Sequence, residues 1–266
     1  NIENVPEHLP FKVESQNRYS VPNLKPVMWG FPVALINVDQ DPEPEIIRAK
    51  PNYVVCEDFL STGAAIHWQM NFPAEFNGKK GSVAAFSISQ SLDLGTEKTT
   101  IVITGSTENN WNSRFWVIDA EKGVTLNEFE MPSGPDLNQD GRWDGSYSVI
   151  GALDVPSETG LRKALIIICN VGFDLEKRGA YAVDPWSGEI LWSFEPGAAI
   201  TYTESEVLDL DGDGTKEVLL TTRSPHNLGG RLVNGYSDDR PFMFALGANG
   251  ALLWFRELIP NPAQPL

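Results

Sequence analysis

Residues 207–220 read VLDLDGDGTKEVLL, an acidic loop between two apolar runs. Asp209, Asp211 and Asp213 stand at alternate positions, and Glu217 closes the set. Carboxylates this close repel one another at neutral pH, and a bound divalent cation removes that repulsion. Calcium suits the loop best, because it is bound by several hard oxygen ligands. The sequence therefore predicts a calcium site; the alternative is a solvated acidic turn without a metal.

The segments on either side of this loop are predicted to be strands. The spacing of the aspartates begins like an EF-hand loop, but the closing glutamate comes too early. Residues 218–222, VLLTT, are β-branched and apolar, which is typical of a strand and not of an exiting helix. Gly212 and Gly214 allow the backbone to wrap around an ion with positive φ. The loop is thus expected to join two strands.

A degenerate copy of the loop lies in residues 31–47, FPVALINVDQDPEPEII. Asn37, Asp39, Asp41 and Glu45 take the places of the four acidic residues described above. Apolar residues flank this copy on both sides, but Pro42 alters the turn. Two interpretations stay open: the loop binds a cation weakly, or it survives only as a turn.

A third acidic loop, residues 136–144, reads DLNQDGRWD and lies outside the register of the other two. A cation here would be bound by the side chains of Asp136, Asn138, Asp140 and Asp144 and by the carbonyl of Arg142. The alternative is a turn rich in Asn and Asp that is held by its own hydrogen bonds.

The pattern of strand, polar loop and strand recurs along the chain, starting near residues 33, 83, 149 and 206. A second pattern, an apolar strand, a short turn with glycine and another strand, is found at residues 115–126, 180–192 and 242–254. It predicts a β-hairpin. Residues 64–70 hold the matching place in the first unit, without the glycine turn. Each unit then supplies four antiparallel strands, which is the composition of a β-propeller blade.

We therefore expect an all-β fold, a β-propeller of about four blade-like repeats. The expected repeats cover residues 31–80, 81–132, 145–200 and 201–266, after an irregular N-terminal arm of residues 1–30 that includes a short strand at 11–14. Four blades close poorly, because most propellers use more. The chain is therefore expected to be part of a larger propeller, to form a homo-oligomer, or to take further blades from a partner chain.

Two family resemblances follow from these motifs. The acidic loop between strands resembles the FG-GAP (integrin-type) repeats of β-propellers. The hairpin at 180–192 resembles the repeat of quinoprotein (PQQ-type) propellers. The first resemblance implies that calcium braces the blade at Asp209, Asp211, Asp213 and Glu217, with Thr215 giving its carbonyl. Neither resemblance fixes a function, because propellers carry unrelated activities.

Composition excludes several classes of partner. Hydrophobic residues make up 41% of the 266 residues, enough for a substantial core. The formal net charge of −16 argues against a nucleic-acid partner. No apolar run is long enough for a membrane span. The chain starts at Asn1 without a signal peptide, which fits a mature secreted or a trimmed chain, so an extracellular or periplasmic location is expected.

No constellation of catalytic residues emerges. The three histidines, His8, His67 and His226, are not spaced as a zinc pair, and we assign His67 to the core and His226 to a long loop. Cys56 and Cys169 could form a disulfide, but buried free thiols are favoured. A quinoprotein dehydrogenase would carry a vicinal cysteine pair, which this sequence lacks. A polysaccharide lyase would need a Lys, Arg and Tyr constellation, which we do not find.

The favoured function is non-enzymatic: an extracytoplasmic binding or scaffold module of bacterial type, for a protein or carbohydrate ligand. Residues 108–113 and 224–239 would form its contact face. Trp192 and Trp254 end repeat strands and are expected to pack between blades. Trp111 and Trp143 lie in polar loops, where they could stack on a sugar or a peptide. The alternatives are part of a quinoprotein-type or polysaccharide-acting enzyme, or the sensor domain of a signalling protein.

Overall fold

A computed structural model of the chain describes residues 33–258, except 40, 42, 51–52, 61–62, 73–74, 77–78, 81–82, 108–109, 133, 135–144, 172–174 and 224–229. The described residues belong to one compact unit, Phe31–Leu266. The N-terminal arm expected at 1–30, with its short strand, lies outside them.

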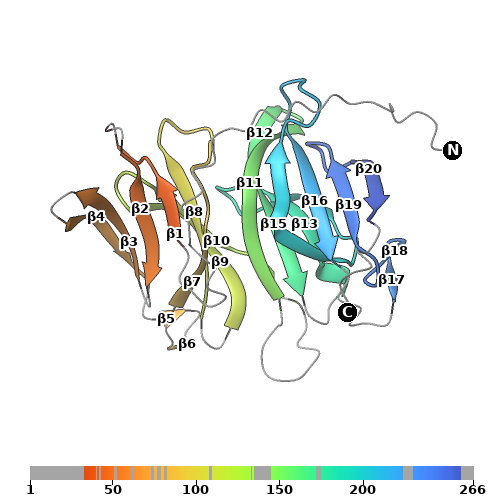
Figure 1. Ribbon diagram of the computed structural model, residues 1–266, viewed down its shortest axis with the longest axis horizontal. Coiled ribbons are helices and arrows are strands. Elements are labelled where there is room, and N and C mark those ends of the chain that lie inside the picture. The colour runs from red at the N-terminus through yellow and green to blue at the C-terminus, as the bar shows by residue number, and fades with distance from the viewer. Residues whose placement is uncertain are drawn as a thin grey trace. The chain divides into compact units, whose positions relative to one another are not determined.

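The unit is built from four four-stranded antiparallel sheets, which follow one another along the chain (Figure 1). Sheet 1 contains β1 (Val33–Ile36), β2 (Glu45–Lys50), β3 (Tyr53–Leu60) and β4 (Gly63–Asn71). Sheet 2 contains β7 (Val83–Ile88), β8 (Thr100–Thr107), β9 (Asn110–Asp119) and β10 (Val124–Glu130). Sheet 3 contains β11 (Gly145–Ser157), β12 (Gly160–Val171), β13 (Gly179–Val183) and β14 (Ile190–Phe194). Sheet 4 contains β15 (Ala199–Leu208), β16 (Glu217–Arg223), β19 (Phe242–Leu246) and β20 (Leu252–Glu257).

Two small hairpins lie between these strands. One is formed by β5 (Glu75–Phe76) and β6 (Lys79–Lys80), and the other by β17 (Leu232–Val233) and β18 (Tyr236–Ser237). Among the described residues, the helical content is the single 3-10 turn Leu175–Lys177, so none of these residues forms a helix that could cross a membrane. The expected all-β, propeller-like fold of four-stranded repeats is confirmed.

The long apolar run in β12 is explained by packing on both faces of sheet 3. Ile166 and Ile168 pack with the apolar residues of sheet 4, whereas Leu165 and Ile167 pack with those of sheet 2. A separate core joins sheets 1 and 2. Strands covered on both faces read as continuous apolar runs, because neither face meets water. Each interior sheet is therefore held through side-chain packing by the sheet before it and the sheet after it.

A recurring contact links the last strand of one sheet to the glycine turn of the next. The indole Nε1 of Trp68 donates to the carbonyl of Ala120 at 2.8 Å, and that of Trp192 donates to the carbonyl of Ala248 at 3.0 Å. A Cβ at Gly250, where φ is +78°, would lie 2.6 Å from the Trp192 ring. Glycine is needed there both for the backbone conformation and for the close approach of the ring.

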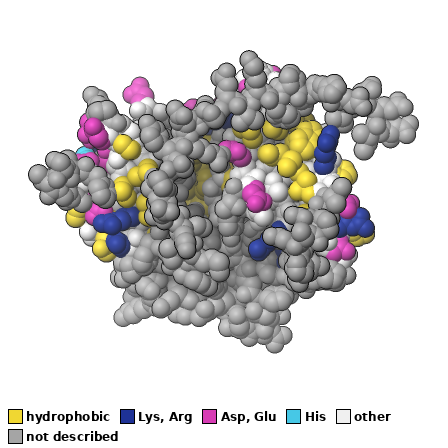
Figure 2. All heavy atoms as spheres, in the orientation of Figure 1, with side chains coloured by type: hydrophobic (Ala, Val, Ile, Leu, Met, Phe, Trp, Pro, Cys, Tyr) yellow, Lys and Arg dark blue, Asp and Glu magenta, His cyan; other side chains and the backbone are white. Residues whose placement is uncertain are grey.

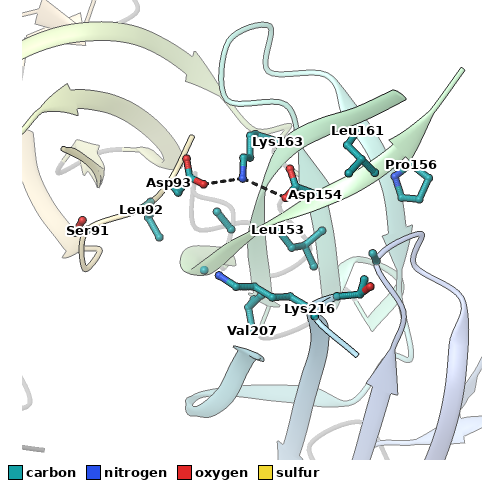
Figure 3. A pocket seen from close by; sticks show the side chains of 15 residues that line it. Ser91, Leu92, Asp93, Leu153, Asp154, Pro156, Leu161, Lys163, Val207 and Lys216 are labelled. Carbon is teal, nitrogen blue, oxygen red and sulfur yellow. Dashed lines mark hydrogen bonds and ion pairs between the residues drawn. The ribbon is translucent and has the colours of Figure 1, made fainter. Parts of the chain in front are cut away.

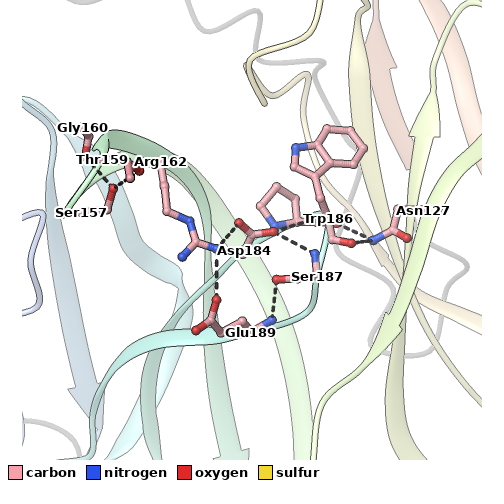
Figure 4. A network of polar contacts seen from close by, with 10 residues as sticks. Asn127, Ser157, Thr159, Gly160, Arg162, Asp184, Trp186, Ser187 and Glu189 are labelled. Carbon is pink, nitrogen blue, oxygen red and sulfur yellow. Dashed lines mark hydrogen bonds and ion pairs between the residues drawn. The ribbon is translucent and has the colours of Figure 1, made fainter.

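Sheets 2 and 3 use an amide in place of the indole (Figure 4). The Nδ2 of Asn127 donates to the carbonyls of Pro185 and Trp186 at 2.8 and 2.9 Å. The turn that it contacts is held by Asp184, which lies 2.7 Å from Arg162 and accepts from the backbone N–H of Ser187. The contact between successive sheets is thus kept even where the tryptophan is absent.

Trp254 holds the corresponding place in sheet 4, but it is 38% exposed. Within the described part of the chain its indole makes no hydrogen bond to a further sheet. The expected contact between blades is therefore confirmed for Trp192 and is absent for Trp254 among the described residues.

The two cysteines are free and buried, as expected. Burial, with a smaller effect from Glu45, Asp58 and Asp39, raises the pKa of the Cys56 thiol to about 12. The assignment of His67 to the core is wrong, because its side chain is 27% exposed and lies beside two carboxylates. The cause is a β-bulge in the pairing of β3 with β4, which places His67 out of the alternation that the sequence suggests.

Candidate metal centres

The acidic loop of sheet 4 connects β15 to β16 and is held by its own aspartates. Asp209 accepts hydrogen bonds from the backbone N–H groups of Gly212 and Gly214 at 2.7 and 2.9 Å. Asp213 accepts from the N–H of Thr215 at 2.6 Å. The two glycines have φ of +82° and +91°, a conformation that other residues adopt only with strain. The loop therefore takes its shape from residues that the sequence analysis assigned to a cation.

Glu217 is the first residue of β16 and is only 6% exposed. One of its carboxylate oxygens accepts from the N–H of Leu210 at 2.8 Å. Burial, and then the neighbouring charges of Asp211, Asp213 and Asp209, raise the pKa of Glu217 above its usual range. A buried carboxylate beside other carboxylates carries an electrostatic cost, and a cation would remove it.

The structure brings three of the predicted ligands together. Asp209, Asp211 and Glu217 each offer an oxygen atom, and these atoms all lie within 4.8 Å of one another. Asp213 and Thr215 belong to the same loop but not to this group of three. An oxygen donor set of this kind fits a hard divalent cation such as calcium.

The loop of sheet 1 repeats the same hydrogen bonds. Glu45, at the start of β2 and 1% exposed, accepts from the N–H of Val38 at 2.6 Å, as Glu217 accepts from Leu210. Asp39 accepts from the N–H of Asp41, and Asp41 accepts from the N–H of Glu43, both at 2.9 Å. The degenerate copy recognised in the sequence is therefore a structural copy.

The two loops differ at their first polar residue. Asn37 donates its amide to the carbonyl of Asp41, whereas Asp209 accepts from Gly214. Pro42 stands at the position of Gly214 and has no N–H to donate. The loop of sheet 1 thus lacks both the first carboxylate and the hydrogen bond that fixes it.

A residue that the sequence analysis did not connect with either loop joins the site in sheet 1. His67 of β4 lies with Asp39 and Glu45 in a group whose ligand atoms are within 4.8 Å of one another. Its Nε2 is 2.8 Å from Asp58 and 3.7 Å from Asp39. A signal was present in the sequence: a histidine between the apolar residues Ile66 and Trp68.

The third predicted site, formed by Asp136, Asn138, Asp140, Arg142 and Asp144, lies outside the described residues and stays a prediction. The same is true of His8, His226, Trp143 and the side chain of Trp111. Much of the expected contact face, including residues 224–229, also lies outside them.

A cavity of about 580 Å³ is lined by residues of sheets 2, 3 and 4 (Figure 3). Lys163 lies between Asp93 and Asp154, at 2.7 and 3.1 Å. The hydrogen bond to Lys163 lowers the pKa of Asp93. Lys216, from the acidic loop of sheet 4, also lines the cavity, and among the described residues no carboxylate forms an ion pair with it. This cavity was not foreseen from the sequence, because its walls come from three separate repeats.

On the face shown in Figure 2, the described charged side chains are not gathered into a single patch. On the face shown in Figure 2, acidic side chains are scattered among hydrophobic ones, and the few basic side chains are separated from one another. The basic side chains described on this face do not form the continuous basic surface that binds nucleic acid.

No protein-family model matches the chain, and no curated protein sequence does either. Among solved structures, a europium-containing methanol dehydrogenase matches 85% of this chain and 41% of its own, with a TM-score of 0.46 and 13% identity. The Dos1 propeller matches 86% of this chain and 47% of its own, with a TM-score of 0.48 and 13% identity. The V. cholerae biofilm matrix protein Bap1 matches 88% of this chain and 40% of its own, with a TM-score of 0.38 and 13% identity.

This chain spans less than half the length of these structures, and the likeness concerns the fold alone. The assignment of a propeller-like fold to this chain rests on its own four four-stranded antiparallel sheets.

Proposed function

We propose that this chain is a calcium-stabilised β-propeller module that binds a ligand or acts as a scaffold outside the cytoplasm. The observation that supports calcium most directly is the buried Glu217, held beside Asp209 and Asp211 in the loop between β15 and β16. Extracellular and periplasmic fluids offer enough calcium for a site of moderate affinity. The ion would have a structural role: it ties the loop between β15 and β16 to the first residue of β16.

Calcium should raise the melting temperature. Binding to the folded state alone stabilises by about 2.7 kcal/mol when calcium is at 100 times its dissociation constant. For a domain of this size, that corresponds to a shift of about 5–10 °C. Calorimetry in calcium and in EDTA measures the shift.

The Asp211→Asn variant should show a smaller calcium shift, because the loop of sheet 4 loses one ligand and the other acidic loops remain. Glu158→Gln, in the exposed turn between β11 and β12, removes one charge and should keep the full shift. An identical melting temperature of the wild type in calcium and EDTA, or an undiminished shift in Asp211→Asn, would contradict the proposal.

The cavity between sheets 2, 3 and 4 is our candidate for the ligand site. It has room for a small sugar unit, and Lys216 offers a cation that no described carboxylate neutralises. A carbohydrate that carries carboxylates, such as a polyuronate, matches this chemistry.

The binding role can be measured by calorimetric titration of an oligogalacturonate into calcium-loaded protein. The Lys216→Met variant should weaken binding at least tenfold, because the one unpaired cation of the cavity is lost. Lys122→Met, at an exposed turn of sheet 2, should bind as the wild type does. Equal affinity of the wild type and Lys216→Met would refute the role of this cavity.

We further propose that a partner chain packs against the last strand of sheet 4, β20, where Trp254 is exposed. Three of the four sheets place a polar side chain of the last strand on the turn of the next sheet. Trp254 presents the same kind of group without a partner among the described residues. A second copy of the chain or a blade from another chain, with a glycine turn, would complete the series.

A further inference from the structure

The four sheets share a β-bulge in the last strand, and one of them carries a different residue there. In sheets 2, 3 and 4 the residue left unpaired by the register shift is a leucine: Leu126, Leu191 and Leu253. In sheet 1 the bulged residue is His67. Because the bulge lies at the same place in every repeat, histidine is an exception at a position where this fold takes leucine. Sheet 1 therefore places a side chain that can bind a metal where the other three sheets carry an apolar one.

The imidazole of His67 lies among three carboxylates from three different elements. Its Nε2 is 2.8 Å from Asp58 of β3 and 3.7 Å from Asp39 of the loop between β1 and β2. Glu45, from the start of β2, completes with Asp39 and His67 a group of ligand atoms within 4.8 Å of one another. Donor atoms this close could converge on one common ion after small rotations of the side chains, because each would bind it at about 2.0–2.2 Å.

The charge of this group favours a cation. Three carboxylates face one imidazole, so even a protonated histidine leaves the group negative. Within the described residues, His67 is the ion-pair partner of both Asp58 and Asp39. If His67 paired with Asp58 alone, the negative charges of Asp39 and the buried Glu45 would lie close together without a positive charge paired with them among the described residues. Asp39 also lines a cavity of about 670 Å³, which gives an ion a way in from solvent.

The donor set differs in kind from that of sheet 4. The sheet 1 loop has Asn37 where the sheet 4 loop has Asp209, and it gains a nitrogen donor from β4. Imidazole suits zinc and neighbouring transition metals, whereas calcium prefers oxygen donors only. The neighbouring Cys56 thiol is completely buried, so the nitrogen of His67 and the carboxylate oxygens remain as the donors.

We propose that sheet 1 holds a second metal site, formed by His67, Asp39, Glu45 and Asp58, which selects a divalent transition-metal ion such as zinc over calcium. Nε2 of His67 and the carboxylates of Asp39 and Glu45 would hold the ion, and Asp58, now 2.8 Å from that nitrogen, would move apart from it to bind the same ion. The same type of loop thus forms two metal sites of different selectivity, one in sheet 1 and one in sheet 4. This site is separate from the calcium loop of sheet 4, so either can fail without the other.

The experiment titrates cobalt and zinc into the full chain in buffer saturated with calcium. The wild type should bind one cobalt ion per chain with visible d–d absorption, and zinc should displace it. The His67→Leu variant restores the residue of the other three sheets. Its zinc affinity should be at least tenfold lower, and the visible absorption of bound cobalt should disappear. The Asp211→Asn variant should keep the zinc affinity and the cobalt absorption of the wild type, while calcium raises its melting temperature by less.

Circular dichroism in EDTA confirms that His67→Leu is folded. If that variant does not fold, Asp58→Asn takes its place and should also lower zinc affinity at least tenfold. The proposal is overturned if the wild type binds no cobalt or zinc in the presence of calcium. It is also overturned if the folded His67→Leu variant, or Asp58→Asn in its place, binds zinc as tightly as the wild type.

Discussion

Replacing Gly250 by alanine tests how the sheets are held together. Gly250 lies in the turn between β19 and β20 with φ of +78°, and a Cβ there would lie 2.6 Å from Cδ2 of Trp192. The indole of Trp192 belongs to sheet 3 and donates to the carbonyl of Ala248 in the same turn. The substitution therefore strains the backbone of sheet 4 and pushes away the ring that links it to sheet 3.

The expected loss of stability in Gly250→Ala has two parts. An alanine at this φ costs about 1–2 kcal/mol in backbone strain. Displacement of the ring adds about 1–3 kcal/mol for overpacking, which includes weakening of the hydrogen bond to Ala248. Gly235 supplies the matched control, because its φ is +90° and nothing lies within 4 Å of the Cβ it would gain. Gly235→Ala should therefore show only the backbone cost, and Gly250→Ala should be less stable by about 2 kcal/mol more.

The assay is urea unfolding of both variants followed by circular dichroism, with the melting temperature as a second measure. A difference of about 2 kcal/mol corresponds to about 4–8 °C. Adding Trp192→Ala to Gly250→Ala should remove the clash, so the double variant should lose less stability than the two single variants combined. Equal stability of Gly250→Ala and Gly235→Ala, or strictly additive effects, would refute the assigned role of this contact.

Two further predictions concern the same framework. Trp192→Ala should lower the free energy of unfolding by about 3 kcal/mol. Trp254→Ala should lower it by less than about 1 kcal/mol in urea unfolding, because this side chain covers no further sheet in the described part of the chain. Burial opposes the ionisation of Asp184, but the N–H of Ser187 and the guanidinium of Arg162 outweigh it and lower the pKa below 3.8. Its stabilising effect is complete above that pH and is lost as the pH falls through the lowered pKa. The difference in unfolding free energy between the wild type and Asp184→Asn should therefore become smaller from pH 5 to pH 2. A difference that stays constant over this range would contradict the assigned role of Asp184.

Much of the fold could be predicted because its signals are local. Acidic loops such as the one before Glu217, and glycine turns such as the one at Gly250, are specified by a few neighbouring residues. Alternating and continuous apolar runs then identify the strands. The spacing of these signals along the chain was enough to recognise four repeats of four strands.

The parts that could not be predicted depend on contacts between distant residues. His67 was assigned to the core from its apolar neighbours, and a bulge in β4 turned it toward Asp58. The cavity at Lys216 is lined by three repeats, so no single stretch of sequence reveals it. Trp192 and Trp254 have similar local sequences, but among the described residues only Trp192 has a following sheet to contact.

The two outer faces of the array are chemically unlike. On sheet 1, Arg48 and Glu57 form an ion pair at the positions where sheet 4 directs Leu220 and Leu246 toward sheet 3. Sheet 4 ends instead in the partly exposed indole of Trp254. The outer side of sheet 1 adds the exposed side chains of Val33, Leu35 and Ile66 to this ion pair, so the two ends of the array present different side chains and association through repeat-like contacts would be directional.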